Sequence, residues 1–470
     1  MIQKALGFTA LAIMIGFMAN EILNFNGQDS LFMLLTSATF LTLNIFILFQ
    51  KNLTFYHPLI LIVFNVFVGI FLRSFYMVHI RSEQTLHLFF AGKDIDHFLL
   101  PTLYVFIGTF LMLLAFTLPL KIKPWMNRLL MKSQNSDWQP GRVHLVVFVF
   151  LALGVLGTVL FVQRMGLGNV LQEISASAGK KHLQVEGEYK FAALGYYRWL
   201  AGLAKLAFYI SLIHWLDQKQ PLKGPGFWLM IISFLFSIFF PFFTSSRSSL
   251  GLIVFNALVI FSVYRKVNPG VLAGLAIFGI LVFNYMTQLR LEKWAGQGAA
   301  QEQGVLDPLI FNRNLLDISK TGHVIQSVPE NLEYKWGSSL SSILVAPIPR
   351  TLWPGKPVIN VGKEIALKVY NVDPDLSMGI PPGLFAEFYL NFGAVGLIIG
   401  MFLFGRWLAV LYKTFTNHNI AYPSSILLYI AFLLSTCIIM LSSSVNQGII
   451  DALQLYIPSW LAIRFMNKPV

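Results

Sequence analysis

The chain has 470 residues, of which 56% are hydrophobic and only 12% are charged, whereas a soluble domain carries about 25% charged residues. Such a chain lacks the polar side chains that cover a water-exposed surface, and a lipid-facing surface does not need them. The formal net charge of +13 is ordinary for a membrane protein with basic cytoplasmic loops, and because no basic run alternates with stacking aromatic residues, a nucleic-acid-binding protein is disfavoured.

Apolar runs recur along the whole chain. A helix needs about 20 mostly apolar residues to cross a membrane. Runs of this kind lie at residues 5–24, 31–49, 58–80, 98–120, 143–163, 195–216, 227–243, 250–264, 269–288, 384–412, 424–441 and 446–464. We therefore predict an all-α multi-pass membrane protein with about twelve transmembrane helices, forming a single transmembrane domain over residues 1–470. For the short pair at 227–243 and 250–264, a re-entrant hairpin is the alternative.

Basic residues are concentrated in alternate short loops, and such loops are cytoplasmic in most membrane proteins. They include Lys4, Lys51, Lys121, Lys123, Arg128, Lys132, Arg142, Lys219, Lys223, Arg265, Lys266, Lys413, Arg464 and Lys468. This pattern predicts cytoplasmic N- and C-termini. It places three long loops on the opposite side of the membrane, at residues 81–97, 164–194 and 289–383.

The loop at 289–383 is far longer than a usual connection, which is typical of a functional segment. It is rich in Trp, Leu, Ile, Pro and Tyr, and this composition favours an ordered loop. Residues 363–370 are predicted to form a short helix along the membrane surface, with Ile365, Ala366 and Val369 on its apolar side.

Cationic residues gather near the extracytoplasmic ends of the predicted helices. A charge at mid-membrane costs about 2.5 kcal/mol or more by insertion scales, so each one requires a reason. The planar guanidinium group of arginine binds two phosphate oxygens at once, so the set predicts a site for a polyanionic lipid headgroup. Snorkelling to the interface is the alternative for any single residue. The set comprises Arg73, Arg81, Arg247, Arg290 and Arg350, with Ser245 as a hydroxyl donor in the serine-rich turn around Arg247. Lys205 is the exception, because it lies midway along its apolar run.

Two residues are candidates for a general base. Glu387 lies at the extracytoplasmic start of the run 384–412, where a carboxylate suits that role, although a contact with the helix dipole or an ion pair is the alternative. His323 lies in the long loop and is the second candidate. A zinc site is disfavoured, because Cys437 is the single cysteine and the nine histidines lack metal-binding spacing.

Three segments of the chain resemble Wzy-type oligosaccharide repeat-unit polymerases, the O-antigen polymerases. They are GSSL at 337–340, PIPRTLWPGKP at 347–357 and PPGLFAEFYLNFGAVG at 381–396, and the Ser-Arg turn at Arg247 is also similar. The resemblance is concentrated in residues 244–396, and the N-terminal half is similar to the family in hydropathy alone. It implies a helical membrane protein with a large, partly helical periplasmic loop, in an architecture similar to that of GT-C glycosyltransferases.

The resemblance implies a metal-independent glycosyltransferase in the bacterial inner membrane. Its substrate would be an undecaprenyl-diphosphate-linked oligosaccharide at the periplasmic face, and the growing glycan would pass to the non-reducing end of a new lipid-linked unit, with release of undecaprenyl diphosphate. A chain-length-regulating co-polymerase is the usual partner. Direct displacement with one base predicts inversion at the anomeric carbon.

For such an enzyme, we expect the charge of the departing diphosphate to be stabilised by Arg247, Arg290 and Arg350. The residues expected to assist in binding are Arg73, Arg81, Ser245, Arg313 and Lys356. Either Glu387 or His323 accepts the proton of the acceptor hydroxyl. The aromatic side chains of Trp336, Trp353 and Tyr389 are expected to stack on sugar rings, with anchoring at the membrane interface as the alternative.

Two other functions are alternatives. An O-antigen ligase transfers the same donor to lipid A core, but ligases resemble each other in a histidine-containing motif at the end of the large loop, and residues 376–387 contain no histidine. A lipid-linked oligosaccharide flippase would have charges at mid-depth and short loops on both sides. This chain has most of these charges near one face and a long loop, which favours the polymerase.

Overall fold

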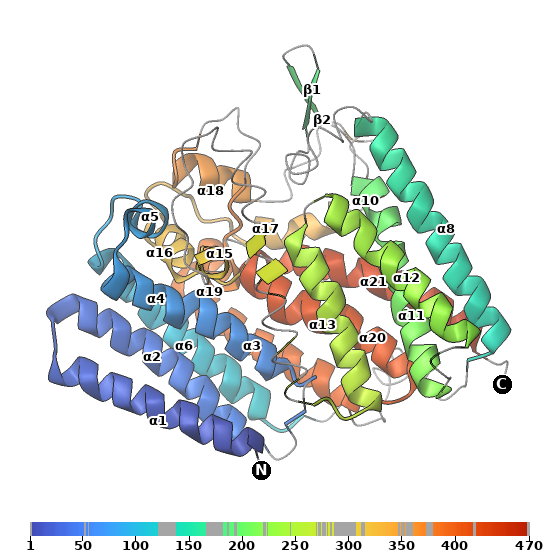
Figure 1. Cartoon of the computed structure of the whole chain (residues 1–470). Helices are drawn as coiled ribbons and strands as arrows, with labels where there is room; N and C mark the ends of the chain where they lie inside the picture. The colour runs from blue at the N-terminus through green and yellow to red at the C-terminus, as the bar shows by residue number, and fades with distance from the viewer. Residues whose placement is uncertain are drawn as a thin grey trace. The chain divides into compact units, whose positions relative to one another are not determined.

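The computed structural model describes residues 2–50, 53–54, 56–120, 138–165, 182–185, 188–191, 195–219, 222, 224–244, 246–268, 270, 274, 279, 281–282, 284–285, 307–311, 315–345, 348, 353, 361–372, 379–416 and 420–467. These residues are predominantly helical (Figure 1). The strands β1 (His182–Val185) and β2 (Glu188–Phe191) form an antiparallel hairpin, with His182 opposite Phe191.

Nine helices among the described residues are long and apolar enough to cross a membrane. They are α2 (Gly27–Leu48), the helix Pro58–Ile80, α6 (Asp96–Thr117), α8 (Pro140–Met165), α10 with α11 (Gly195–Ala201 and Leu203–Asp217), α12 (Pro225–Phe243), α19 (Leu384–Thr416), α20 with η5 (Pro423–Leu434 and Ser435–Met440) and α21 (Val445–Met466). Shorter apolar stretches lie in α1 (Ile2–Leu23) and α13 (Arg247–Tyr264). The protein is therefore a helical, multi-pass membrane protein.

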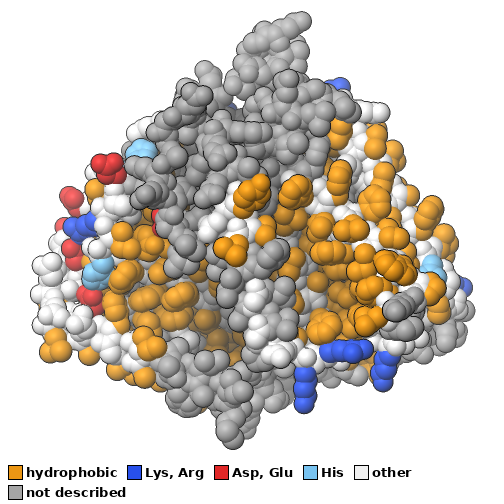
Figure 2. Space-filling model, viewed as in Figure 1, with side chains coloured by type: hydrophobic (Ala, Val, Ile, Leu, Met, Phe, Trp, Pro, Cys, Tyr) orange, Lys and Arg blue, Asp and Glu red, His pale blue; other side chains and the backbone are white. Residues whose placement is uncertain are grey.

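Eleven of the predicted runs coincide with these helices or apolar stretches. The remaining run, at 269–288, lies largely outside the described residues, so the number of twelve stays a prediction. Hydrophobic side chains cover wide areas of the surface (Figure 2), as expected where helices face lipid instead of water. Phe148 and Leu403, for example, are 68% and 60% exposed.

The chain forms two compact units. Unit 1 contains Met1–Lys121, Ile310–Lys413 and Ser435–Asp451. In it α2 packs against α1, α6 and the helix Pro58–Ile80. That helix comprises α3 (Pro58–Val66), η1 (Phe67–Leu72), α4 (Arg73–Phe75) and η2 (Tyr76–Ile80), and η1 and η2 are π-helical. Helix α19 approaches α6 closely at Gly405, where a Cβ atom would lie 2.1 Å from the carbonyl oxygen of Met112. Small residues permit such close packing between membrane helices.

Short helices of unit 1 lie outside the long apolar ones. They are α5 (Glu83–Thr85), η3 (Leu86–Phe90), α16 (Ile318–Gln326), α17 (Ser338–Ser341), η4 (Ser342–Val345) and α18 (Gly362–Lys368). The last four lie in the long loop, where α15 (Asp307–Ile310) precedes them. The long loop is thus partly helical, as predicted.

Helix α18 confirms the short helix predicted at 363–370, but its surroundings differ from the prediction. Ile365 and Ala366 are 0% and 1% exposed, so protein covers the side that was expected to face the membrane. Glu364 forms ion pairs with Lys335 at 2.6 Å and with Lys368 at 3.0 Å. Burial alone would raise the pKa of Glu364, but the hydrogen bonds and charges of the two lysines hold it below its usual value. Helix α18 is therefore packed into the loop.

Unit 2 contains Ile122–Leu309, Thr414–Leu434 and Ala452–Val470. Its helix α11 packs against α8, α12, α13 and α20. Asn256 of α13 donates a hydrogen bond of 3.2 Å to the Tyr209 hydroxyl of α11. The predicted short pair at 227–243 and 250–264 corresponds to α12 and α13, which are continuous helices of 19 and 18 residues.

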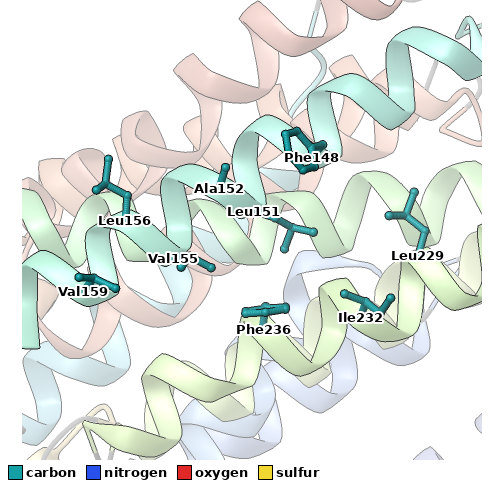
Figure 3. Close-up of a pocket in the computed structure, with 9 residues that line it drawn as sticks. All are labelled: Phe148, Leu151, Ala152, Val155, Leu156, Val159, Leu229, Ile232 and Phe236. Atoms are coloured by element: carbon teal, nitrogen blue, oxygen red, sulfur yellow. The ribbon is translucent and has the colours of Figure 1, made fainter.

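An apolar groove of about 640 Å³ lies between α8 and α12 (Figure 3). Its lining is hydrocarbon throughout: Phe148, Leu151, Ala152, Val155, Leu156, Val159, Leu229, Ile232 and Phe236. It contains no side chain suited to acid–base chemistry or to phosphate binding, whereas unit 1 contains clusters of buried polar residues.

Candidate functional site

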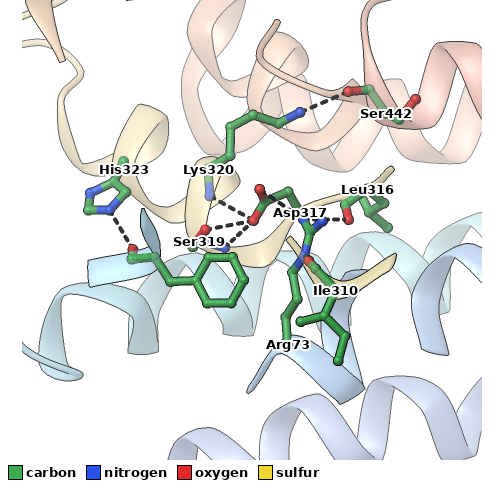
Figure 4. A network of polar contacts seen from close by, with 9 residues as sticks. Arg73, Ile310, Leu316, Asp317, Ser319, Lys320, His323 and Ser442 are labelled. Atoms are coloured by element: carbon green, nitrogen blue, oxygen red, sulfur yellow. Dashed lines mark hydrogen bonds and ion pairs between the residues drawn. The ribbon is translucent and has the colours of Figure 1, made fainter. Parts of the chain in front are cut away.

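A buried ion pair joins a membrane helix to the long loop. Arg73 Nη1 lies 2.8 Å from Asp317 Oδ2 (Figure 4), and Arg73 is 0% exposed. Its Nε donates to the carbonyl oxygen of Ile310 at 2.7 Å, and Nη1 donates to that of Leu316 at 3.1 Å. The backbone comes very close here, because a Cβ atom on Gly69 would lie 1.8 Å from the Leu316 oxygen. This glycine lets the loop dock against the helix that carries Arg73.

Asp317 also begins helix α16. Its Oδ1 accepts hydrogen bonds from the backbone N–H groups of Ser319 and Lys320, at 3.0 and 3.1 Å, and from the Ser319 hydroxyl at 2.7 Å. Such an N-cap satisfies amide groups that have no partner inside the helix. Burial alone would raise the pKa of the Asp317 carboxyl, but Arg73, Lys320 and these hydrogen bonds hold it below its usual value. Asp317 is therefore ionised at neutral pH and fixes the start of α16.

Two further side chains of α16 hold it in place. Lys320 is 2% exposed, and its Nζ donates to the carbonyl oxygen of Ser442 at 2.9 Å (Figure 4). His323 Nε2 lies 2.9 Å from the carbonyl oxygen of Phe89, which requires a proton on that nitrogen. Burial lowers the pKa of His323, although the hydrogen bond to Phe89 and the charge of Asp317 act in the opposite direction. His323 is thus a neutral, buried donor at neutral pH.

Glu387 lies at the start of α19 in a different environment. It is 1% exposed. Its Oε2 accepts from the Val445 backbone N–H at 2.7 Å, and its Oε1 accepts from the Ser339 hydroxyl at 3.2 Å. Both donors are neutral, and none of the ion pairs between described side chains includes Glu387. A buried carboxylate with neutral partners alone is unusual, because burial without a cation penalises its charged form.

Asparagine side chains orient the serine that contacts Glu387. Asn391 Nδ2 donates to the Ser339 hydroxyl at 2.7 Å, and its Oδ1 accepts from the Gly337 backbone N–H at 2.9 Å. Asn446 donates to Ser342 Oγ at 2.7 Å and also to the Ser339 carbonyl oxygen. With Asn391 donating to it, the Ser339 hydroxyl directs its own proton toward Glu387 Oε1.

The turn at 441–444 connects the polar residues around Asp317 with those around Glu387. Its Ser442 carbonyl accepts from Lys320, and the next helix, α21, begins at Val445, which donates to Glu387. On the other side, the Gly383 N–H donates to the Ser443 carbonyl oxygen at 2.9 Å. Gly383 has φ +79°, and a Cβ atom there would lie 3.2 Å from the Leu441 oxygen, so glycine permits this contact. The position of Glu387 therefore depends on the same turn that Lys320 holds.

Aromatic side chains lie beside this cluster. Trp336 is 74% exposed, and its ring centroid lies 5.5 Å from that of Tyr334 and 6.5 Å from that of Phe392. Helix α19 is broken at Phe392 and Gly393, where Gly393 has φ +64°. The first part of α19, from Leu384 to Asn391, thus forms a short helix that carries Glu387 and Asn391 and ends in a bend at Phe392 and Gly393. These rings form an exposed aromatic surface, as a sugar-binding site would require.

The structure places several of the predicted site residues in other roles. Arg73 was predicted to bind substrate or to snorkel, but its guanidinium group is fully buried and pairs with Asp317. Arg81 pairs with Asp29, and its Nη2 lies 2.6 Å from Oδ1. The carboxylate partly neutralises the charge that Arg81 was expected to offer to a diphosphate. Tyr389 packs against Tyr104, with ring centroids 5.6 Å apart, and Trp353 is 40% exposed.

Arg290, Arg313, Arg350, Lys356 and Ser245 lie outside the described residues, as does the side chain of Arg247, whose backbone begins α13. Within the described part of the chain, no three side chains of His, Cys, Asp or Glu gather in an arrangement that could hold a metal ion.

Sequence reasoning missed Asp317, Lys320, Ser339, Asn391 and Asn446. One signal was present for Asp317, because an arginine within an apolar run requires a carboxylate or carbonyl partner. The other residues are ordinary polar side chains of a loop or a helix start, and their spacing carries no information about which of them meet.

A family model described as a domain of unknown function, DUF8712, matches residues 247–418. No curated protein and no solved structure matches the chain. The matched residues include Asp317, Ser339 and Glu387, so the candidate site falls largely within a domain to which the description assigns no activity.

Proposed function

We propose that the protein is a glycosyltransferase that polymerises oligosaccharide repeat units linked to undecaprenyl diphosphate at the extracytoplasmic face of a bacterial inner membrane. The observation that carries this proposal is the environment of Glu387, a buried carboxylate whose described partners are neutral donors. Ser339 and Glu387 belong to two of the segments that resemble Wzy-type polymerases, and a hydrogen bond joins them.

The contrast with Asp317 supports a chemical role for Glu387. Asp317 has the partners of a structural carboxylate, namely Arg73, a second nearby cation and an N-cap. Glu387 has a hydroxyl and a backbone N–H group. A carboxylate held in place by neutral donors keeps its ability to accept a proton, which is what a general base requires.

The proposed reaction is a direct displacement. The acceptor hydroxyl oxygen attacks the anomeric carbon of the donor sugar, and the bond from that carbon to the diphosphate oxygen breaks. Undecaprenyl diphosphate leaves with the bonding electrons, and the hydroxyl proton passes to Glu387. Because Glu387 is buried and its carboxylate contacts Ser339, the segment that carries Ser339 must move aside when the acceptor binds.

Charge on the departing diphosphate requires cations, which act best in a water-poor site. In this proposal Arg247, Arg290 and Arg350 supply that charge, with Arg313 and Lys356 as further candidates, whereas Arg73 and Arg81 are assigned to their ion pairs. Trp336 and Trp353 contact the sugar rings. His323 is assigned a structural role, because its Nε2 already donates to Phe89 and burial lowers its pKa. A chain-length-regulating protein is the proposed partner.

The test uses purified full-length protein with synthetic undecaprenyl-diphosphate-linked repeat units, in buffer that contains EDTA. A ladder of products of increasing length supports the polymerase. Single transfer to lipid A core would assign the protein to the ligases instead. Movement of the lipid-linked unit across a vesicle membrane without new glycosidic bonds would assign it to the flippases. Either of these outcomes would overturn the proposal.

A further inference from the structure

A second pocket lies in unit 2, where two helices end and a third begins. Helix α11 ends at Asp217, α13 ends at Tyr264 and α20 begins at Pro423. The pocket has a volume of about 600 Å³, within the range of about 300–1,000 Å³ that is typical of ligand sites. Its lining combines charged, aromatic and apolar side chains, namely Leu216, Asp217, Lys219, Tyr264, Arg265, Ala421, Tyr422 and Pro423. We call it the α11–α13 pocket.

The cations of this pocket are available to a ligand. Lys219 and Arg265 are both exposed, and neither takes part in an ion pair with another described side chain. Lys219 has φ +47° and follows the last turn of α11. Asp217 is half-buried and accepts a hydrogen bond from Gln218. Two cations and one carboxylate leave the lining with one net positive charge, which matches a single phosphodiester.

Tyrosine residues add a polar group to the pocket and indicate its position across the membrane. The Tyr264 hydroxyl is buried and has no hydrogen-bond partner among the described residues, although buried hydroxyls are usually paired. Tyr422 is 42% exposed. Tyrosine is enriched where membrane helices meet the headgroup layer, and all three helices of this pocket are apolar. The pocket therefore lies at the level of lipid headgroups.

We propose that the α11–α13 pocket binds the phosphodiester headgroup of an anionic phospholipid. Lys219 and Arg265 contact the phosphate oxygens, Tyr264 donates its hydroxyl proton, and Leu216, Ala421 and Pro423 contact the apolar part of the lipid. Basic pockets between membrane helices on the cytoplasmic side bind anionic headgroups in other proteins, and the distribution of basic loop residues predicts the cytoplasmic side for this pocket. The assignment is independent of the proposed transferase activity.

Native mass spectrometry of the full-length protein in detergent tests this proposal. Phosphatidylglycerol is titrated as the anionic lipid, phosphatidylethanolamine as the zwitterionic lipid, and inorganic phosphate and glycerol phosphate as soluble anions. We expect phosphatidylglycerol to bind saturably. Phosphatidylethanolamine, inorganic phosphate and glycerol phosphate should displace it only weakly. Equal binding of both lipids would overturn the proposal, and so would displacement by soluble phosphate at concentrations that match the lipid.

Charge variants provide the sharper test. Each cation near an anionic headgroup contributes about 1 kcal/mol, so Lys219→Gln and Arg265→Gln should each weaken phosphatidylglycerol binding about fivefold. Arg265→Lys should retain most of the affinity. Asp217→Asn removes the one carboxylate from the lining and should strengthen binding about fivefold, a gain that cannot come from misfolding. The matched control is Lys266→Gln, an exposed cation beside Arg265 that does not line the pocket. A loss in Lys266→Gln as large as that in Arg265→Gln would show general surface attraction and would overturn the assignment.

Discussion

Arg73 Nη1 and Asp317 Oδ2 lie 2.8 Å apart, with the two side chains 0% and 6% exposed. One belongs to an apolar helix and the other to the long loop that the polymerase-like motifs occupy. The pair gives the loop a fixed attachment to the membrane helices, and α16, with Lys320 and His323, extends that attachment. The loop segment that contacts Glu387 is therefore part of a defined structure.

Breaking this ion pair from one side should destabilise the protein strongly. Asp317→Asn leaves the buried charge of Arg73 without its carboxylate, a change that typically costs about 3–5 kcal/mol. The matched control is Asp29→Asn, whose partner Arg81 is 46% exposed and whose loss should cost at most about 1 kcal/mol. The free energy of unfolding in detergent measures both. The double variant Arg73→Met with Asp317→Asn should be more stable than Asp317→Asn alone, and equal losses at Asp317 and Asp29 would refute the structural role.

Gly69 should tolerate no side chain. A Cβ atom there would lie 1.8 Å from the backbone oxygen of Leu316, so Gly69→Ala must push the 315–317 segment away and weaken the Arg73–Asp317 pair. Hydrogen exchange in Ile318–Gln326 should become faster. The control is Gly16→Ala in α1, where a Cβ meets nothing within 4 Å and where alanine should stabilise the helix by about 1 kcal/mol. Unchanged exchange in Gly69→Ala would contradict the close approach.

Stability should fall when the pH drops below 6.5, the ordinary pKa of histidine. Burial lowers the pKa of His323 in the folded protein, so the unfolded chain binds a proton first and the folded state loses stability as the pH falls from 6.5 toward the folded pKa. Asp317 does not contribute in this window, because its pKa lies below the ordinary 3.8; its contribution is lost only at more acidic pH. Because His97 lies beside His323, the test compares the His97→Gln protein with the double variant His97→Gln/His323→Gln. As the pH falls, the free energy of unfolding should decline less in the double variant than in His97→Gln.

The stereochemistry of the product tests the single-displacement mechanism. With one base and no covalent intermediate, the anomeric configuration of the donor sugar is inverted in the new linkage. NMR of the polymer made from a donor of known configuration measures this directly. Retention would require a nucleophile on the enzyme, and would rule out Glu387 as a base acting on the acceptor in a direct displacement.

Much of the fold could be predicted from the sequence because each membrane helix is a local feature. An apolar run of sufficient length must be helical in lipid, and the runs at 31–49, 58–80 and 98–120 coincide closely with α2, the helix Pro58–Ile80 and α6. Helix α18 was also predicted, since Ile365 and Ala366 lie on one side of it. Its burial was missed, because the sequence does not tell whether lipid or protein covers an apolar side.

The site was predictable only in part, because it depends on contacts between distant segments. Glu387 was identified from its place at the start of an apolar run, but its partners Ser339 and Val445 come from other parts of the chain. Arg73 was recognised as an unusual charge within an apolar run. Its partner was missed, because nothing in the sequence distinguishes Asp317 from the other aspartates of the long loop. The arginines that would bind the diphosphate remain predictions.

The most direct test of the account is polymerisation by the Glu387→Gln variant. Glutamine keeps the shape of the side chain and an oxygen for the Val445 N–H, but it cannot accept the proton of the acceptor hydroxyl. We predict that the rate of ladder formation falls by about 10²–10⁴-fold, while the protein inserts and binds the lipid-linked unit as before. Glu364→Gln, which removes the charge of a partly exposed carboxylate in the long loop, should polymerise at nearly the normal rate. A Glu387→Gln protein that forms the ladder as fast as Glu364→Gln would contradict the account.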